Sequence, residues 1–260
     1  MAQSRAGRIV VVSNRGPVTF SRGESGEREY SRGAGGLVTA LNAVVRQSEG
    51  AVWIASAQSE EDVAVANEPA PYEVEDLRVT LVEHDPDSYD LMYNQLANPL
   101  LWFVQHGLYD LPYSPALGDD TRKAWEEGYV PVNRNFAEAV AVAVGDEESP
   151  TVLLHDYQLY MTPHFVREHL GAGAFLSLFV HIPWPEPDLW RVLPAYVSEG
   201  VVESLLQADI VAFHTHLYAR NFAETAVAVL GAEADVENGV IHYKGREVWV
   251  RAYPISIDPS

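Results

Sequence analysis

The sequence contains no cysteine among its 260 residues. Disulfide bridges, a thiolate nucleophile and a cysteine-ligated zinc site are therefore excluded. Long apolar runs are also missing, since no stretch reaches the length that a bilayer-spanning helix needs. The short apolar run at 9–12 continues into Ser13 without a small-residue cleavage site, which favours a strand over a signal peptide. We expect a soluble, cytoplasmic protein with no membrane partner.

Lysine is nearly absent, because Lys123 and Lys244 are the only two among 17 cationic residues. Acidic residues number 37, and the formal net charge is −20. Such a surface mainly serves solubility, and it disfavours nucleic acid, whose phosphates need a basic partner. Any phosphate that the protein binds must therefore be met by local arginines.

The histidines, aspartates and glutamates show no spacing typical of a metal site. The imidazoles of His214 and His216, for example, would lie on opposite sides of a strand. We therefore expect neither a metal nor any other cofactor.

Six short segments are mostly apolar on both faces and rich in β-branched or aromatic residues, which is typical of buried parallel strands. They are Arg8–Asn14, Ala51–Ser56, Arg78–Glu83, Thr151–Asp156, Phe175–His181 and Asp209–His214. Helical patterns lie between and after them at Leu37–Gln47, Asp87–Asn98, Asp119–Val144, Met161–Glu168, Glu186–Leu206 and Leu217–Leu230. This alternation predicts an α/β fold with a doubly wound, mostly parallel sheet in a single domain over residues 1–260. Segment 239–258 instead predicts a hairpin that turns at Lys244 and Gly245, followed by an exit strand.

Polar and aromatic residues follow four of the predicted strands, where ligands of open α/β sheets bind. These runs are Ser13–Pro17, His155–Gln158, His181–Pro185 and Phe213–His216. The carboxyl ends of parallel strands share one edge, so we expect the four runs to converge. Two interpretations of His155 and Asp156 remain open: a solvated helix start with Asp156 as the N-cap, or part of a site.

Two further segments fit a site, and each also has a structural explanation. The glycines of Arg32–Leu37 would let the backbone approach an anion, or would form a flexible loop ending in a helix cap. They do not match the dinucleotide fingerprint G-x-G-x-x-G. Segment Tyr93–Trp102 places two rings around three side-chain amides, which suits a sugar but is also typical of core aromatics beside a helix end.

Seven motifs together resemble the trehalose-phosphate synthase family of retaining glycosyltransferases, in the same order and at similar spacing. They are VVVSNRGP (10–17), RGAGGL (32–37), YNQLANPLLW (93–102), HDYQLYMTP (155–163), HIPWPEPDLWRVLP (181–194), ADIVAFHTHLYARNF (208–222) and YPISIDP (253–259). The resemblance covers nearly the whole chain. It implies the N-terminal, Rossmann-like, acceptor-binding half of a two-domain GT-B fold.

The resemblance also implies an activity, the transfer of glucose from UDP-glucose or a similar nucleotide sugar to glucose 6-phosphate, which yields trehalose 6-phosphate. In this family the donor's own phosphate oxygen is thought to take the acceptor proton, so the protein supplies positioning and charge stabilisation. By resemblance, Asp156 orients the acceptor hydroxyls and His181 lies beside the donor glucose as the second catalytic residue. The acceptor site would comprise Arg15, Trp53, Tyr93, Trp102 and Asp156, and the donor site Gly35, Gly36 and His181.

Two departures from the family pattern leave alternatives open. Trp184 stands where many members have phenylalanine, a feature shared with pseudo-glycosyltransferases, which puts the identity of the acceptor in doubt. The chain also stops where the family enters its nucleotide-sugar domain, so we expect residues 1–260 to be inactive without a separate C-terminal domain. A pseudo-glycosyltransferase, another glycosyltransferase with a related acceptor and a non-catalytic sugar-phosphate binding module remain the alternatives, and a homo-oligomer remains open.

Overall fold

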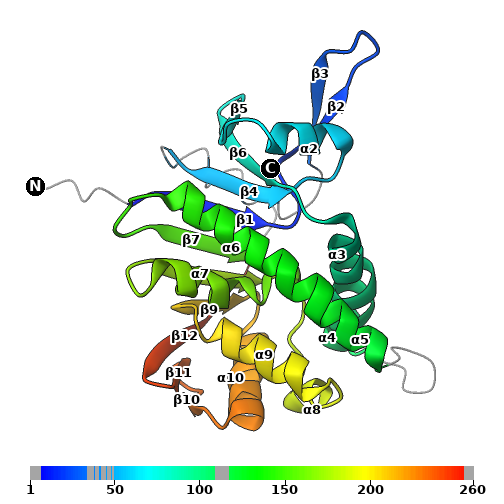
Figure 1. Cartoon of the computed structure of the whole chain (residues 1–260). Helices are drawn as coiled ribbons and strands as arrows, with labels where there is room; N and C mark the ends of the chain where they lie inside the picture. Colours follow the sequence, from blue (N-terminus) through cyan, green and yellow to red (C-terminus); the bar gives the residue numbers. More distant parts are fainter. Residues whose placement is uncertain are drawn as a thin grey trace, which may run out of the picture.

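The computed structural model describes residues 7–33, 38, 41, 45, 48, 50–108 and 117–254. Ten of the described strands form one sheet in the order β10-β11-β12-β9-β8-β7-β1-β4-β6-β5, while β2 and β3 form a separate hairpin (Figure 1). The strands are β1 Ile9–Ser13, β2 Val18–Arg22, β3 Arg28–Arg32, β4 Val52–Ser56, β5 Tyr72–Val74, β6 Leu77–Val82, β7 Thr151–His155, β8 Phe175–Val180, β9 Ile210–Phe213, β10 Glu233–Asp235, β11 Val240–Tyr243 and β12 Arg246–Ala252.

Helices of three kinds connect these strands. They are α2 Glu60–Ala66, α3 Pro86–Asp90, the π-helix η1 Leu91–Trp102, α4 Phe103–Gln105, α5 Asp119–Lys123, the π-helix η2 Ala124–Tyr129, α6 Val130–Val144, the 3₁₀ turn η3 Tyr157–Leu159, α7 Thr162–Leu170, α8 Pro187–Trp190, α9 Ala195–Leu205 and α10 His216–Leu230. None of the helices in the described ranges is long and apolar enough to cross a membrane.

All six strands predicted from the sequence are confirmed, and they pair with one another in parallel, as predicted for the sheet. From β1 the chain adds β4 and β6 on one side, then returns to add β7, β8 and β9 on the other. The strand order therefore reverses between β1 and β7, which is where doubly wound sheets bind ligands. The register places Ser13 at the end of β1 opposite His155 at the end of β7.

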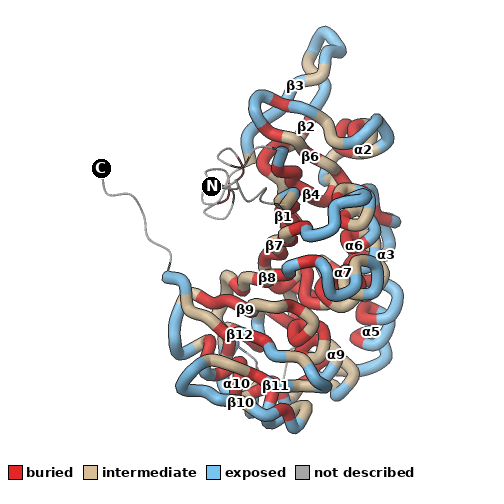
Figure 2. The backbone as a smooth tube through the Cα atoms, turned by 90° about the vertical axis from the view of Figure 1, so that its left-hand side faces the viewer, coloured by how far each residue is buried: buried red, intermediate tan, exposed pale blue. Residues whose placement is uncertain are grey.

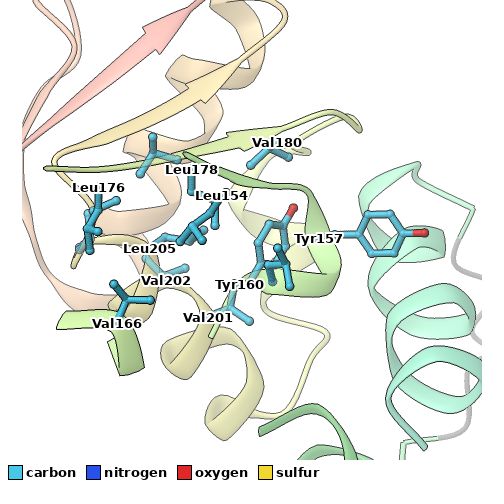
Figure 3. Packing of buried hydrophobic residues seen from close by; sticks show 14 of the residues in the cluster. Leu154, Tyr157, Tyr160, Val166, Leu176, Leu178, Val180, Val201, Val202 and Leu205 are labelled. Atoms are coloured by element: carbon cyan, nitrogen blue, oxygen red, sulfur yellow. The ribbon is translucent and has the colours of Figure 1, made fainter. Parts of the chain in front are cut away.

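Alternate residues of the central strands pack into two different cores, so the sheet is covered on both sides here. Val10 and Val12 of β1 join the larger core, whereas Val11 joins a smaller core with the fully buried Trp53 of β4. Figure 2 shows the buried residues along the middle of the molecule, and Figure 1 shows α6, α7 and α9 across one face of the sheet. Figure 3 shows side chains of β7 and β8 packed against those of α9, while Tyr157 points away from this cluster.

The predicted helices agree with the structure with one correction. Segment Asp119–Val144 is helical throughout, as α5, η2 and α6 in succession. The prediction of one helix over Glu186–Leu206 was wrong, because α8 ends at Trp190 and α9 begins at Ala195. Pro194 lacks a backbone N–H and disfavours the α conformation of the residue before it, which separates the two helices. The predicted helix Leu37–Gln47 lies largely outside the described residues.

The C-terminal hairpin is confirmed, with β11 and β12 joined at Lys244 and Gly245. Both residues have positive φ, 47° and 78°, the combination that a tight type I′ hairpin turn requires. Strand β12 then pairs in parallel with β9 and so extends the main sheet. The sequence analysis missed the β2–β3 hairpin and α2, although Ser59 and Asp62 form a capping box at the start of α2.

Candidate active site

The candidate site lies at the point where the strand order reverses. Arg15 follows β1, Asp156 follows β7 and His181 follows β8, so the polar runs predicted to converge do share one edge of the sheet. A hydrogen bond joins two of these runs, because the backbone N–H of His181 donates to Asp156 Oδ1 at 3.1 Å. The position is the one where an open α/β sheet offers a crevice to a ligand.

Buried residues beneath the site hold the backbone of Arg15. Trp53 Nε1 donates to Ser13 Oγ at 2.8 Å, and Ser13 Oγ in turn donates to the carbonyl oxygen of Arg15 at 2.7 Å. Trp53 has no exposed surface. The structure therefore places Trp53 below the site, where it reaches the predicted ligand-binding arginine only through Ser13.

Tyr93 lies next to Arg15 and ends a stack of aromatic rings. Arg15 Nη2 donates to Tyr93 Oη at 3.4 Å. The ring of Tyr93 stacks on Tyr89 with centroids 5.8 Å apart, and Tyr89 stacks on His84 at 5.5 Å. Tyr89 Oη also donates to Asn14 Oδ1 at 3.2 Å, so the stack is tied to the residue that precedes Arg15. This arrangement fixes the phenol and the guanidinium relative to each other.

The π-helical geometry of η1 decides which of its side chains face the site. In an α-helix, nine residues make about 2.5 turns, which would put Tyr93 and Trp102 on opposite faces. The i→i+5 bonding of a π-helix widens each turn, so residues four or five apart follow one face. Tyr93, Asn98 and Trp102 have this spacing, and Asn98 Oδ1 accepts a hydrogen bond from Tyr157 Oη at 2.7 Å. Trp102 itself stacks on His106 with centroids 3.9 Å apart.

Asp156 has a backbone conformation that non-glycine residues rarely adopt, with φ 77° and ψ 174°. Such outliers cluster at functional sites and cost about 1–3 kcal/mol each. Asp156 does occupy the N-cap position of η3, but its side chain makes no capping hydrogen bond among the described residues, so capping does not account for the carboxyl. The residue as a whole is half-buried, and desolvation of its carboxyl raises the pKa to about 7.

Three histidines gather around Phe179 at the ends of β7, β8 and β9. His155 Nδ1 lies 3.0 Å from His181 Nε2, and the ring of His214 lies 5.2 Å from that of His181. Burial lowers the pKa of His155 to about 3 and that of His181 to about 4, and it also lowers the pKa of His214. All three imidazoles are therefore neutral near pH 7. No group of three or more potential metal ligands is found in the described part of the chain.

A polar cavity of about 300 Å³ adjoins Arg15. Its lining consists of backbone and polar groups at Arg15, Gly16, Val18, Thr19, Ser31, Arg32, Gly33, Ser56 and Gln58. Gly33 is required there, because an added Cβ would lie 2.4 Å from the carbonyl oxygen of Gly16. Arg32 is partly neutralised, since its Nη2 pairs with both carboxylate oxygens of Glu75 at 2.9 and 3.0 Å. The predicted donor-binding residues Gly35 and Gly36 lie outside the described residues.

Trp184 belongs to the core and presents no surface to an acceptor. Its side chain is fully buried, stacks on Trp190 with centroids 4.3 Å apart, and donates from Nε1 to Thr225 Oγ1 at 3.1 Å. Trp184 therefore gives no structural reason to doubt the identity of the acceptor.

The sequence analysis quoted the motif that contains Tyr157 without giving this residue a role, and it counted Asn98 only as one of three amides that suit a sugar. It also missed Tyr89 and His84, which lie outside the quoted motifs, although Tyr89 precedes Tyr93 by four residues, the spacing of neighbours on one helix face. Asn14 was also missed. It stands in the motif at the end of β1, and its position directly before Arg15 was the one feature of the sequence that could have indicated a role for it.

The family model for glycosyltransferase family 20 matches residues 7–260. The chain belongs to glycosyltransferase family 20. Among family 20 relatives, it is 35% identical to the α,α-trehalose-phosphate synthase [UDP-forming] of Yarrowia lipolytica, over 96% of this chain and 51% of that protein. It is 31% identical to the validamine 7-phosphate valienyltransferase of Streptomyces hygroscopicus subsp. jinggangensis, over 96% of this chain and 52% of that protein.

The fold is also that of solved family 20 structures. The crystal structure of the α,α-trehalose 6-phosphate synthase from Burkholderia multivorans superposes with a TM-score of 0.76 at 27% identity, covering 97% of this chain and 49% of that one. The predicted α/β class, a mostly parallel sheet as in the N-terminal half of a GT-B enzyme, is thus confirmed. This chain spans about half the length of the relatives that it matches.

Proposed function

We propose that this chain is the acceptor-binding half of a retaining glycosyltransferase that transfers glucose from UDP-glucose to glucose 6-phosphate and forms trehalose 6-phosphate. The observation that carries the proposal is the pairing of Arg15, which follows β1, with Tyr93, and the strained Asp156 at the end of the adjacent strand β7, at the reversal point of the sheet. Together they offer a cation, a phenol and a carboxyl at one edge of the sheet. A sugar phosphate needs this combination for its phosphate and its hydroxyls.

Arg15 and Tyr93 are proposed to bind the acceptor phosphate. A guanidinium meets a phosphate through two parallel N–H bonds, and the phenol adds a third hydrogen bond. The chain carries a net charge of −20, so such a local cation is needed to hold a dianion at all. Trp102 and Asn98, on the same face of η1, would then line the path of the sugar ring, while Trp53 would support Arg15 from below through Ser13.

Asp156 is proposed to orient the acceptor hydroxyls. The backbone N–H of His181 uses part of the acceptor capacity of its carboxyl, and the remaining lone pairs can receive sugar hydroxyls. His181 would lie beside the donor glucose. With these groups positioning the two substrates, the attacking hydroxyl passes its proton to the departing phosphate of the donor, and no protein nucleophile is needed.

A donor half is proposed to complete the enzyme, either as further chain or as a separate protein. Two arginines line the described cavity, and Arg32 is already paired with Glu75. A nucleotide diphosphate sugar would therefore find too little positive charge on this half alone. Gly35 and Gly36 are proposed to approach the donor diphosphate through their backbone amides.

The acceptor assignment is tested by calorimetric titration of residues 1–260 with glucose 6-phosphate and with glucose. We expect the phosphate ester to bind more tightly, and Arg15→Ala to lose roughly 1.5–3 kcal/mol of binding free energy, since a charge-assisted hydrogen bond is removed. Arg220→Ala is the matched control, because Arg220 is an exposed arginine on α10 paired only with its helix neighbour Glu224 among the described residues. Equal affinities of the wild type and Arg15→Ala would refute the assignment.

A second candidate is a pseudo-glycosyltransferase, favoured by the 31% identity to a validamine 7-phosphate valienyltransferase. The same phosphate site would serve an aminocyclitol phosphate, so the two candidates differ in the hydroxyls or amine that face Asp156. Competition between glucose 6-phosphate and validamine 7-phosphate for residues 1–260 separates them. A non-catalytic sugar-phosphate module would bind glucose 6-phosphate and yield no product with any donor half.

A further inference from the structure

His155 lies directly behind His181 and shares a hydrogen bond with it. The distance from His155 Nδ1 to His181 Nε2 is 3.0 Å, and the ring centroids lie 5.3 Å apart. His155 is only 7% exposed and sits in the last position of β7. Phe179 stacks on His181 at 4.5 Å and on His155 at 6.4 Å, so both rings are confined. His155 therefore cannot reach a ligand itself, but it contacts a residue that can.

Only one proton lies in the contact between the two rings, and two arrangements are possible. Burial makes both imidazoles neutral near pH 7, so one nitrogen of the contact donates and the other accepts. In the first arrangement His155 carries its proton on Nδ1 and donates to His181. In the second, His181 donates from Nε2, and the proton of His155 must sit on its own Nε2.

The surroundings of His155 Nε2 distinguish these arrangements. This atom is buried and has no hydrogen-bond partner among the described residues. A buried N–H without an acceptor loses its hydration with no compensation, and such orphaned donors are rarer in proteins than unsatisfied acceptors. The second arrangement would create an orphaned donor, whereas the first leaves only a lone pair. His155 is therefore the donor, and His181 Nε2 is the acceptor.

We infer that His155 is a positioning residue that holds His181 in its Nδ1–H tautomer, so that His181 offers a ligand an N–H donor at Nδ1. The role of that donor, a hydrogen bond to a hydroxyl of the donor sugar, rests on the proposed function. The tautomer itself does not, because it follows from the contacts of His155.

Nuclear magnetic resonance tests the tautomer directly in residues 1–260. Long-range ¹H–¹⁵N correlation separates protonated from bare ring nitrogens, so it reports where His181 carries its proton. We expect a protonated Nδ1 and a bare Nε2 in His181 of the wild type. A wild-type spectrum in which His181 is protonated at Nε2 would overturn the inference without recourse to any variant.

Two substitutions then test whether His155 sets this state. His155→Asn keeps an N–H donor close to the position of Nδ1 and should preserve the tautomer, while His155→Phe keeps the ring and removes the donor. In His155→Phe we expect the Nδ1–H population of His181 to fall and the Nε2–H form to become detectable. His242→Asn, an exposed histidine on β11, is the control. An unchanged His181 tautomer in a folded His155→Phe would contradict the inference, with folding checked by amide dispersion.

Kinetic assays of residues 1–260 mixed with a separately produced donor half distinguish this inference from the proposed function. We expect His155→Phe to lower kcat about tenfold, the effect of one hydrogen bond, with little change in the KM for glucose 6-phosphate. His155→Asn should recover most of that loss. If wild-type protein shows the predicted tautomer but no activity with any donor half, the proposed function fails and the tautomer assignment stands. Equal activity of all three proteins would remove His155 from the mechanism.

Discussion

Asp156 lowers the stability of the folded chain in two ways at once. Its backbone lies in a region that is nearly restricted to glycine, and desolvation raises its pKa to about 7. A glycine or an asparagine at this position would relieve one or both of these costs. The retention of a carboxyl under such strain is typical of residues that act on a ligand.

The raised pKa predicts how Asp156→Asn changes stability with pH. The unfolded chain has a pKa of about 3.9 for aspartate. Because the pKa of Asp156 is higher in the folded chain, protonation of Asp156 favours folding. This contribution to the free energy of unfolding is fully present below about pH 4 and is lost as the pH rises through 7. The Asp156→Asn variant has no carboxyl at this position, so its free energy of unfolding does not fall in this way as the pH rises. Urea unfolding should give similar stabilities at pH 4 and a variant that is more stable at pH 8, by at most ~4 kcal/mol.

His155 and His181 contribute the opposite slope, because their lowered pKa values make the folded state resist protonation. Their contribution is common to the wild type and to Asp156→Asn, so the difference between the two proteins isolates the carboxyl. If the difference in the free energy of unfolding between the two proteins stays constant from pH 4 to pH 8, the carboxyl of Asp156 is not desolvated.

At the scale of single elements, α8 and α10 form a packing unit around Trp184. Trp184 stacks on Trp190 of α8, meets Phe222 of α10 edge-on, and its carbonyl oxygen accepts from Asn221 Nδ2 at 2.9 Å. The side chain of Trp184 lies within the core and offers no surface to a ligand. Variation at Trp184 within the family should therefore affect stability and leave substrate choice unchanged.

Trp184→Phe tests this assignment. The smaller ring leaves a cavity and removes the hydrogen bond to Thr225 Oγ1, so we expect a loss of ~2 kcal/mol in the free energy of unfolding. The relative affinities for glucose 6-phosphate and validamine 7-phosphate should match those of the wild type. A changed preference between these two acceptors would place Trp184 in the binding site after all.

Elements whose position depends on local pattern were predicted well from the sequence. The six strands are apolar on both faces, and Arg15, Asp156 and His181 could be placed near one another because parallel strands end at one edge. The β2–β3 hairpin was missed because β3 is mostly polar and exposed, which removes the alternation that marks a strand, and β2 has only two apolar residues, Val18 and Phe20. The π-helical course of η1 was also missed, because hydrophobic spacing does not separate it from an α-helix.

The link between the aromatic stack and Asn14 shows a second limit of the sequence. His84 lies just before α3, and Tyr89 and Tyr93 stand four residues apart on the consecutive helices α3 and η1, so their stacking is local in sequence. Asn14, which accepts a hydrogen bond from the phenol of Tyr89, lies 75 positions away in sequence. This contact follows from tertiary packing, and no local spacing predicts it.

At the scale of the whole molecule, a net charge of −20 surrounds a site that we propose binds two phosphate-bearing substrates. Long-range attraction for such anions is unfavourable, so binding depends on contacts made at short range. In this chain Arg15 supplies these contacts, whereas Arg32, the other arginine that lines the cavity, is paired with Glu75. Two halves closing on the substrates would also exclude water and strengthen each of these contacts.

The most direct test of this account is the formation of trehalose 6-phosphate from UDP-glucose and glucose 6-phosphate. Residues 1–260 would be assayed alone and after mixing with the separately produced C-terminal half of a family 20 trehalose-phosphate synthase. We predict no useful turnover by the chain alone, product on mixing, and loss of that product with Arg15→Ala. Robust turnover by residues 1–260 alone, at a rate that the added half does not raise, would contradict the account.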